Sequence, residues 1–513
     1  MKCHLVLLVI SVVMSVSTVF ADTVVHIGDP EIWSPSQLSS YKGQTVKFDV
    51  PFYICSVKGG IFVAPRRLFS PTNQAIPLSD EYNTVISLNS NATVSLSGLS
   101  GYHRTGERID NLTVTVSSTS SLQYKSGTIS SNTREILSKQ HPTVDLRGKH
   151  TLLVCAFNLQ YYLVENLGSG SQGPTTTEYQ RRQHTKIMEA LKRIKADVFG
   201  FVEVEQGQGA LKKLAESLSK ETRRHYTWID DGMSANGTFT KSGYVYCTET
   251  VEPVGSMRNN ETGVRNRKKM QAFKELETGE VFIFSLNHFK AKSGTPKVDG
   301  DQDQGDGQGI FNQSRKEEAS SVLSDCQTSS NFYGDEDILI MGDLNAYGKE
   351  DPIRILTDGG MTDLHRYFHR DTSYSYVFNN LAGYLDHALA SESMLKQVTG
   401  MQAYHINSDE DRSYSYTSSD ETMFRCSDHD PVIVGLCLGT EVIHDSEVEV
   451  ENGLIVIKDA EDGYYRLYNS MGLLVYEGRI TSSYFALPQS MHGICIINIY
   501  TKGEVKQKKL MIL

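Results

Sequence analysis

The sequence predicts an α/β domain at residues 148–440, with an all-β domain on each side of it at residues 22–147 and 441–513. Three observations lead to this fold class. The middle region alternates short apolar runs with segments of helical periodicity. The first region is rich in Ser, Thr and Val in period-two alternation, and the last contains short apolar runs separated by turn residues. At roughly 100–200 residues per domain, a chain of 513 residues has room for all three.

The first 21 residues predict an export signal. Lys2 supplies a positive charge, an apolar run follows from Leu5 to Val13, and the small-residue site Val19-Phe20-Ala21 precedes Asp22. This order is typical of a secretory signal peptide. The apolar run is short for a membrane span, and no other segment reaches that length. We therefore expect a mature chain without a transmembrane segment, secreted or held at the cell surface.

Charge and cysteine content limit the function classes. The formal net charge is −11 at pH 7, so no overall basic field attracts nucleic acid. Binding of a polyanion would need local basic clusters or a bound cation. The seven cysteines after the predicted signal are scattered and form no Cys-x-x-Cys pair, so nothing supports a zinc site.

The region at residues 22–147 contains alternating segments such as Thr45–Val50 and Asn111–Val116, which predict short strands. It has no cluster of His, Asp or Glu suited to catalysis. We interpret it as a binding or spacer module, with an OB-like barrel as one form that it could take. The short runs of residues 441–513 predict a compact β-sandwich.

In the middle region, polar side chains suited to a metal–phosphate site adjoin one predicted strand after another. They are Asn158 after Leu152–Phe157, Glu203 after Val198–Val202, Asn287 and His288 after Val281–Leu286, Asp343 and Asn345 after Ile338–Met341, and Asp428 and His429 before Val432–Leu438. Loops at the strand ends of α/β folds converge on one crevice. Each residue alone has an ordinary explanation as a turn former, helix cap or core histidine. Their ordered combination predicts a catalytic site.

Longer segments of the middle region carry a family resemblance. They are CAFNLQ at 155–160, DVFGFVEVE at 197–205, SLNHFKAKSG at 285–294, GDGQGIFNQSR at 305–315, ILIMGDLNAYGKEDPI at 338–353, GYLDHALAS at 383–391, HINSDE at 405–410 and SDHDPVIVGL at 427–436. Together they resemble the endonuclease/exonuclease/phosphatase family, specifically its large secreted bacterial nucleases. The resemblance implies two packed β-sheets flanked by helices. Departures such as Leu344 and His387 remove no catalytic group.

Phosphodiester hydrolysis needs an activated water, stabilisation of charge on the phosphate, and a proton or metal at the leaving oxygen. Glu203 is the best metal ligand, because Mg²⁺ prefers one or two carboxylates plus waters and phosphate oxygens. The resemblance implies that Asp428 shares this role, with Mn²⁺ as a second candidate ion. Asn158 and Asn345 offer amide dipoles that would hold phosphate, water or metal-bound water.

The resemblance also implies that Asp386 pairs with His429, which fixes the imidazole tautomer and raises its basicity. His429 then either takes a proton from the water or stabilises the phosphate, and Asp343 is the alternative base. His288 is placed as general acid at the leaving oxygen. Arg267 is the preferred phosphate contact, because the family carries an Arg just before this strand.

Two lysines are further candidates for contacts with phosphate, and an acidic loop is a candidate for a second ion site. Lys290 and Lys292 follow His288 and would add positive charge near the phosphate. The acidic, Gly-rich loop at residues 299–307 has alternating oxygen ligands that would suit Ca²⁺, although it lacks the EF-hand spacing with its terminal Glu. The alternative for this loop is a flexible exposed turn.

The leading hypothesis is an extracellular, metal-dependent nuclease acting on DNA, with RNA as a second substrate. The same fold also supports hydrolysis of sphingomyelin or inositol phosphates. A non-catalytic surface adhesin using the two β-domains is the alternative from another class. Residues 441–513 resemble the C-terminal sorting domains of the type IX secretion system, so its machinery is an expected partner. The alternative for this region is an accessory β-sandwich.

Overall fold

The computed structural model describes residues 23–89, 91–130, 146, 152–168, 172–232, 240–258 and 267–439, together with segments between residues 448 and 512. The predicted export signal lies outside these residues. Within the described part, no helix is both long and apolar enough to cross a membrane.

Two six-stranded sheets form the centre of the middle region. The first has the order β10 (Tyr226–Trp228), β11 (Thr240–Cys247), β9 (Val198–Glu205), β8 (Leu152–Tyr162), β21 (Val432–Leu436) and β20 (Val398–Ala403). The second has the order β12 (Val251–Arg258), β13 (Lys269–Glu275), β14 (Val281–His288), β15 (Ile338–Asp343), β19 (Asp386–Ala390) and β16 (Thr362–Asp363). Both sheets mix parallel and antiparallel pairs, since β8 pairs parallel with β9 and β14 parallel with β15.

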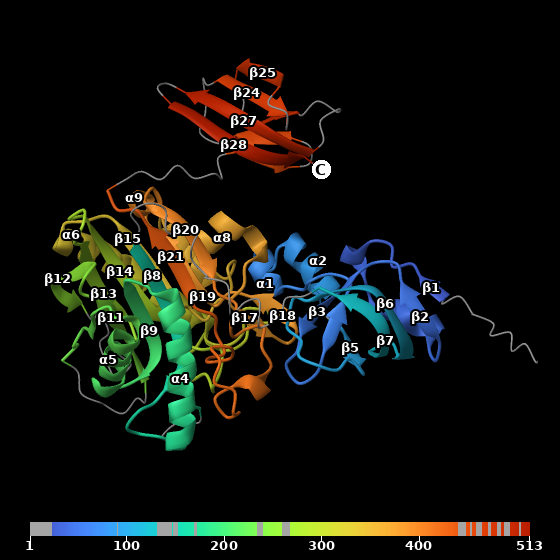
Figure 1. Cartoon of the computed structure of the whole chain (residues 1–513), viewed down its shortest axis with the longest axis horizontal. Helices are drawn as coiled ribbons and strands as arrows, with labels where there is room; N and C mark the ends of the chain where they lie inside the picture. The colour runs from blue at the N-terminus through green and yellow to red at the C-terminus, as the bar shows by residue number, and fades with distance from the viewer. Residues whose placement is uncertain are drawn as a thin grey trace, which may run out of the picture.

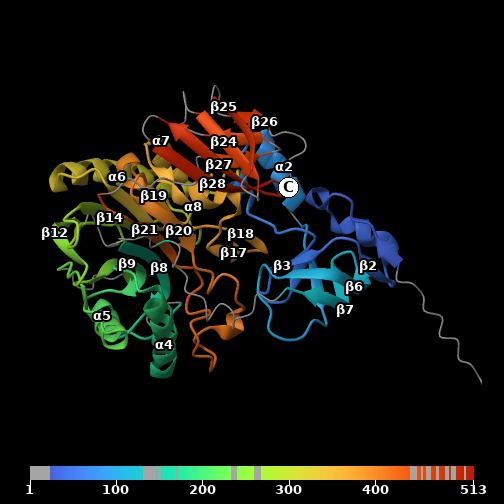
Figure 2. The same ribbon diagram turned by 45° about the horizontal axis from the view of Figure 1, so that its top comes forward.

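The two sheets pack face to face, with helices on both outer surfaces (Figure 2). Val154 and Val202 of the first sheet share a buried core with Leu286 and Met341 of the second. Helices α4 (Thr177–Ile194) and α5 (Gly209–Thr222) pack on the outer face of the first sheet, and α6 (Asn312–Tyr333) and α7 (Asp351–Asp358) pack on the outer face of the second. The expected sandwich of two sheets between helices is therefore present.

The N-terminal region forms a sheet that closes on itself. Its strands β3 (Phe52–Ser56), β4 (Phe62–Ala64), β5 (Val94–Ser97), β7 (Ser121–Ile129) and β6 (Arg108–Ser118) pair in that order, and β6 returns to β3. The β5–β7 pair is parallel, and β1 (Thr23–Val25) and β2 (Thr45–Phe48) extend the sheet beside β6. Five strands closed in this way form a small barrel, with the strand number of an OB fold.

Two helices also lie in the N-terminal region, which was expected to contain strands alone. They are α1 (Pro71–Gln74) and α2 (Asp80–Asn89), between β4 and β5. The α2 sequence contains β-branched residues and Asn, which have weak helix propensity. Tertiary contacts stabilise it, because Tyr82 and Asn89 are buried and Asn89 Nδ2 donates to Phe69 O at 2.9 Å.

The barrel packs directly on the α/β region (Figure 1), and the interface contains buried polar pairs. The fully buried Arg104 donates from Nε to Glu410 Oε1 at 2.6 Å. The Thr72 hydroxyl donates to Glu350 Oε1 at 2.8 Å, and Phe69 forms a β-bridge with Ala382. Buried polar pairs, together with an apolar cluster around Phe69, therefore join the two regions.

The C-terminal region contains strands in two sheets. One has the order β22 (Val448–Glu451), β23 (Leu454–Ile457) and β26 (Tyr484–Ala486); the other has β25 (Leu474–Arg479), β24 (Tyr464–Asn469), β27 (Gly493–Thr501) and β28 (Glu504–Ile512). These strands fall where the apolar runs of residues 441–513 predict them. The sorting role proposed for the region remains a prediction.

Candidate active site

Residues that are distant in sequence meet at one end of the second sheet. Strand β14 ends at His288, β15 ends at Asp343, and the antiparallel β19 begins at Asp386. The register pairs His288 with Asp343, and Asp343 with Asp386. His429 lies just before β21 of the facing sheet. The fold therefore gathers these four side chains at a common edge, as expected from their positions beside strands.

Asn158 and Glu203 differ from the expectation, because both lie within strands that continue beyond them. The pairing of β8 with β9 shifts register between Asn158 and Tyr162, where Gln160 and Tyr161 have positive φ. Glu203 itself has a φ of 58°. A left-handed residue inside a strand redirects the chain and is energetically costly for a non-glycine residue. The irregular backbone, rather than a strand end, presents these two side chains.

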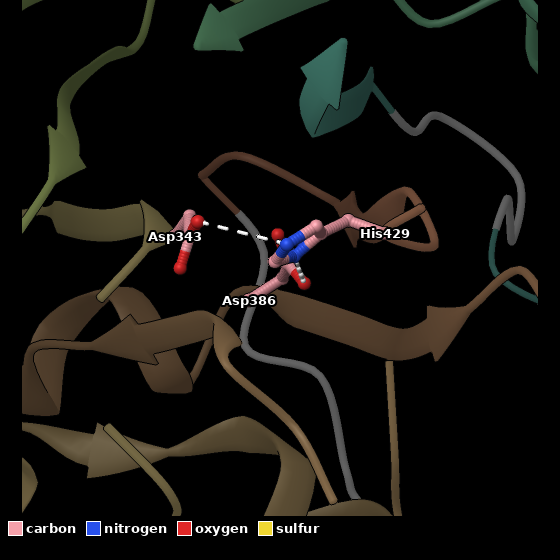
Figure 3. Close-up of side chains that lie close together, drawn as sticks. All are labelled: Asp343, Asp386 and His429. Atoms are coloured by element: carbon pink, nitrogen blue, oxygen red, sulfur yellow. Dashed lines mark hydrogen bonds and ion pairs between the residues drawn. The ribbon is translucent and has the colours of Figure 1, made fainter. Parts of the chain in front are cut away.

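The Asp386 carboxylate holds the His429 imidazole in place (Figure 3). The distance from His429 Nδ1 to Asp386 Oδ2 is 2.8 Å, and the Ser375 hydroxyl donates to the same oxygen at 2.7 Å. An ionised carboxylate accepts hydrogen bonds, so Nδ1 carries the proton. The other ring nitrogen, Nε2, then faces Asp343, with Oδ2 of that residue 3.9 Å away.

Asp343 lies between the two histidines. Its Oδ2 accepts from Asn158 Nδ2 at 3.0 Å and lies 3.7 Å from His288 Nε2. Its Oδ1 accepts the backbone N–H of Asn345 at 2.9 Å. The Asn345 side chain donates instead to Phe289 O at 3.2 Å and thereby fixes the turn after β15.

Glu203 lies on the other side of His288. Its Oε1 is 3.8 Å from His288 Nε2, its Oε2 accepts the backbone N–H of Tyr161 at 3.2 Å, and its side chain is 17 % exposed. Asp428 and Arg267 are near enough to act on Glu203 through their charges. The backbone carbonyl of Arg267 accepts the His288 N–H at 3.2 Å, which ties Arg267 to the same edge. All nine predicted site residues are therefore in or beside one site.

Burial and crowding of charges shift the protonation of this group. Burial, followed by the charge of Asp428, raises the pKa of Glu203 to about 8. Burial raises the pKa of Asp343 to about 6. Burial alone would lower the pKa of His429, but the Asp386 and Asp343 carboxylates outweigh it and raise that pKa well above 6.5. Several acidic groups in a poorly solvated site favour uptake of protons or of a cation.

The donor set suits a divalent metal ion. Asp343, Asp386 and His429 are all buried, and each offers a ligand atom within 4.8 Å of the others, so they form a candidate metal site. Two acceptor bonds, from His429 and Ser375, already occupy Asp386 Oδ2. An ion bound by all three residues would compete with the His429–Asp386 bond unless it used His429 Nε2 and Asp386 Oδ1. Among the described residues, Glu203 accepts a hydrogen bond from the backbone N–H of Tyr161, and it offers a carboxylate beside Asp428.

The additional lysines and the acidic loop have structural partners. Lys292 Nζ bonds Glu350 Oε2 at 2.6 Å, and Lys290 Nζ donates to the carbonyls of Ala291 and Ser293. Both lysines are therefore engaged by groups of the protein, and their contact with phosphate stays a prediction. In the loop, Asp301 accepts from the backbone N–H and the hydroxyl of Ser314, at 2.8 and 2.6 Å. Asp301 therefore anchors the start of α6.

Four residues that support the site were not identified from the sequence. Ser375 binds Asp386, Tyr376 stacks on His429 with ring centroids 4.7 Å apart, Asn407 Nδ2 donates to His429 O at 2.6 Å, and the Ser427 hydroxyl donates to Asn158 O at 2.6 Å. Ser427 and Asn407 lie in the SDHDP and HINSDE segments, so the motifs contained a signal for them. The Ser375-Tyr376 pair carries no such signal, because its role depends on a hairpin formed by β17 (Tyr376–Phe378) and β18 (Leu381–Gly383).

The two-sheet fold and its buried Asp–His centre define an α/β phosphoesterase. The sequence profile of the endonuclease/exonuclease/phosphatase family matches residues 155–429, more than half of the chain. The chain belongs to this family, and it is a hydrolase with a candidate divalent-metal site.

Comparisons with solved structures find similar chains at low sequence identity. An endonuclease/exonuclease/phosphatase family protein from Bacteroides thetaiotaomicron is 18% identical, covering 56% of this chain and 97% of that one, with a TM-score of 0.37. The human Nocturnin catalytic domain with bound sulfate is 15% identical, covering 57% and 96%, with a TM-score of 0.38. A mannosyl-6-phosphatase from Bacteroides thetaiotaomicron is 17% identical, covering 56% and 100%, with a TM-score of 0.38. A comparison with curated proteins found no significant match.

Proposed function

We propose that this phosphoesterase is a divalent-metal-dependent nuclease that hydrolyses phosphodiester bonds in DNA and, as a second substrate, RNA. The observation that carries the hydrolytic chemistry is the position of Asp343 Oδ2, within 4 Å of the Nε2 atoms of both His288 and His429. A scissile phosphate at this point would meet an acid, a base and a carboxylate together. The choice of nucleic acid rests on the resemblance of the GDGQGIFNQSR and HINSDE segments to secreted nucleases.

In this proposal Glu203 and Asp428 hold Mg²⁺ or Mn²⁺, which would supply Lewis-acid stabilisation of the phosphate. His288 protonates the leaving oxygen. Two groups fit the role of general base: His429, oriented by Asp386, or Asp343, which Asn158 and the Asn345 backbone hold in place. Arg267 neutralises charge on the substrate beside Glu203.

The purified full-length protein tests the proposal. Plasmid DNA, RNA and sphingomyelin vesicles would each be incubated with Mg²⁺, with and without EDTA. Chelator-sensitive cleavage of either nucleic acid is the expected result. Cleavage of sphingomyelin alone would move the substrate class to lipids, and no hydrolysis of any phosphoester would favour the adhesin alternative. Activity that persists after exhaustive chelation would exclude the metal role.

We also propose that the protein is exported and that residues 441–513 act as a type IX sorting signal, so that the nuclease works outside the cell. The support is the signal-like N-terminus and the resemblance of the C-terminal segments. Deleting residues 441–513 in the native host is expected to leave active enzyme trapped in the periplasm. Normal arrival of the truncated protein at the surface would show that the region is an accessory domain instead.

A further inference from the structure

A loop of the N-terminal barrel reaches the candidate active site. Lys58 lies in the connection between β3 and β4. Its Nζ donates to Val377 O at 2.7 Å and lies 4.9 Å from the centroid of the Tyr376 ring. The same ring stacks on His429 at a centroid distance of 4.7 Å. A lysine of the barrel and the His429 imidazole therefore contact the same aromatic ring.

A second cation lies on the same side of the site. Arg425 is linked to His429 through Asn407, whose Nδ2 donates to His429 O at 2.6 Å, and its charge acts on both Lys58 and Tyr376. Arg425 is buried, has a φ of 58°, and donates from Nη1 to Asn407 O at 2.9 Å. The left-handed backbone of a buried arginine is costly, so its guanidinium is held at this position against local preference.

The half-buried Lys58 and the buried Arg425 differ in their partners from two other cations removed from solvent, Arg104 and Lys292. Arg104 and Lys292 each bind a buried carboxylate, Glu410 and Glu350, at 2.6 Å. Within the described part of the chain, the side chains of Lys58 and Arg425 donate hydrogen bonds to backbone carbonyls and to no carboxylate. Burial, and then the charge of Arg425, lowers the pKa of Lys58 to about 7. The charges of Asp428 and Asp430 offset this lowering only in part. Cations removed from water are normally paired directly with an anion, so a substrate phosphate would supply the hydrogen-bonded anion that the described residues do not give this pair.

We propose that Lys58 and Arg425 form a subsite for a non-scissile phosphate of a polynucleotide, next to the phosphate that is cut. This inference rests on the proposed nuclease function. Lys58 Nζ contacts Val377 O and the Tyr376 ring rather than Glu203, Asp343 or His288, so a phosphate held by Lys58 would be a second phosphate beside the one that is cut. Nucleic acid carries a phosphate at every nucleotide and would supply both together. Loops that connect the strands of small five-stranded barrels commonly bind oligonucleotides.

Steady-state kinetics of Lys58→Met on two substrates tests this subsite. The first substrate is a short oligodeoxynucleotide, and the second is bis(p-nitrophenyl) phosphate, which has a single phosphate. Loss of one charge-assisted contact is expected to raise KM for the oligodeoxynucleotide roughly tenfold, with kcat much less affected. The loss on bis(p-nitrophenyl) phosphate should be several times smaller. The slope of log(kcat/KM) against log salt should fall by about one.

Two further variants complete the design. Lys58→Arg keeps the charge and should restore most of the oligodeoxynucleotide KM. Lys125→Met removes an exposed lysine from β7 of the same barrel and controls for net charge. Equal losses on both substrates would show that Lys58 only positions Tyr376, and unchanged KM would show that no phosphate binds there. If the wild type cleaves bis(p-nitrophenyl) phosphate but no nucleic acid, the nuclease function itself is wrong, whatever the behaviour of the variants.

Discussion

At the scale of single residues, the site is organised around one oxygen atom. Asp343 Oδ2 accepts a hydrogen bond from the Asn158 amide at 3.0 Å and lies within 4 Å of two imidazole nitrogens. The amide fixes the carboxylate, and Asp386 fixes the tautomer of His429, so both histidines present Nε2 to the same point. Such preorganised donors and acceptors lower the cost of reorganisation during a reaction.

Substituting either histidine should reduce turnover. His429→Ala and His288→Ala are each expected to lower kcat by at least ~10²-fold, the usual contribution of a general acid or base. Both residues lie at strand boundaries, so circular dichroism should show a native fold. His225→Ala, which removes an exposed histidine, serves as the control. A near-normal kcat for either active-site variant would remove that histidine from the mechanism.

Metal binding should depend on pH through Glu203. The pKa of this carboxyl is raised to about 8 without a bound ion, and a metal binds the deprotonated form. Metal affinity should therefore weaken as pH falls below 8, by about tenfold or more between pH 8 and pH 6. Calorimetric titration with Mn²⁺ would measure this change. Glu203→Gln should bind more weakly at pH 8 and lose most of the pH dependence.

Two control variants locate the ion. Glu178→Gln alters an exposed carboxylate of α4 and should leave the titration as in the wild type. Asp386→Asn should impair catalysis more than metal binding if Glu203 and Asp428 hold the ion. If Asp386→Asn abolishes binding and Glu203→Gln does not, the ion lies instead among Asp343, Asp386 and His429.

At the scale of elements, the end of β15 depends on a glycine. Gly342 has a φ of 129°, and a side chain there would overlap the carbonyl oxygen of Asn287 on the paired strand β14. Gly342→Ala should destabilise the protein by about 2–4 kcal/mol and displace Asp343, so activity should fall as well. Urea denaturation measures the first effect.

Gly360→Ala separates the effect of backbone conformation from that of steric overlap. Gly360 has a φ of 94°, but an added Cβ there would meet no atom within 4 Å. That variant should lower the free energy of unfolding by only about 1 kcal/mol, because only its backbone conformation is unfavourable. Equal destabilisation in the two variants would mean that the contact with Asn287 has no effect.

Elements were predicted from the sequence wherever local pattern determines them. The buried strands β14, β15 and β21 are continuous apolar runs, and His288 and Asp343 end two of them as expected. The pattern does not show the left-handed conformation of Glu203, because a single positive φ leaves hydrophobic periodicity unchanged. Lys58 was also missed, since its contact with Val377 joins residues 319 positions apart.

At the scale of the whole molecule, two segments that resemble secreted nucleases contact the N-terminal barrel. Glu410, in the HINSDE segment, accepts a hydrogen bond from Arg104 Nε through Oε1. Both oxygens of its carboxylate also lie within hydrogen-bond distance of the Tyr102 hydroxyl. Gly307, in the GDGQGIFNQSR segment, lies so close to the Tyr82 hydroxyl of α2 that any side chain at this position would overlap it. These segments therefore connect the N-terminal region to the hydrolase, and Asn407 of the HINSDE segment also contacts His429. That connection keeps the Lys58 loop at a fixed place beside His429.

Breaking this connection should uncouple the two regions during unfolding. Arg104→Ala removes the cation paired with the buried Glu410 carboxylate, which is expected to lower the free energy of unfolding by roughly 3–5 kcal/mol. The chain has two tryptophans, Trp33 in the barrel and Trp228 in the α/β region, so Trp→Phe variants report each region separately by fluorescence. With the native interface intact, the barrel and the α/β region should unfold at the same urea concentration. In Arg104→Ala the Trp33 transition should move to lower urea, whereas Arg108→Ala, which removes an exposed ion pair on β6, should leave both in place. Separate transitions before any substitution would show that the barrel and the hydrolase fold independently.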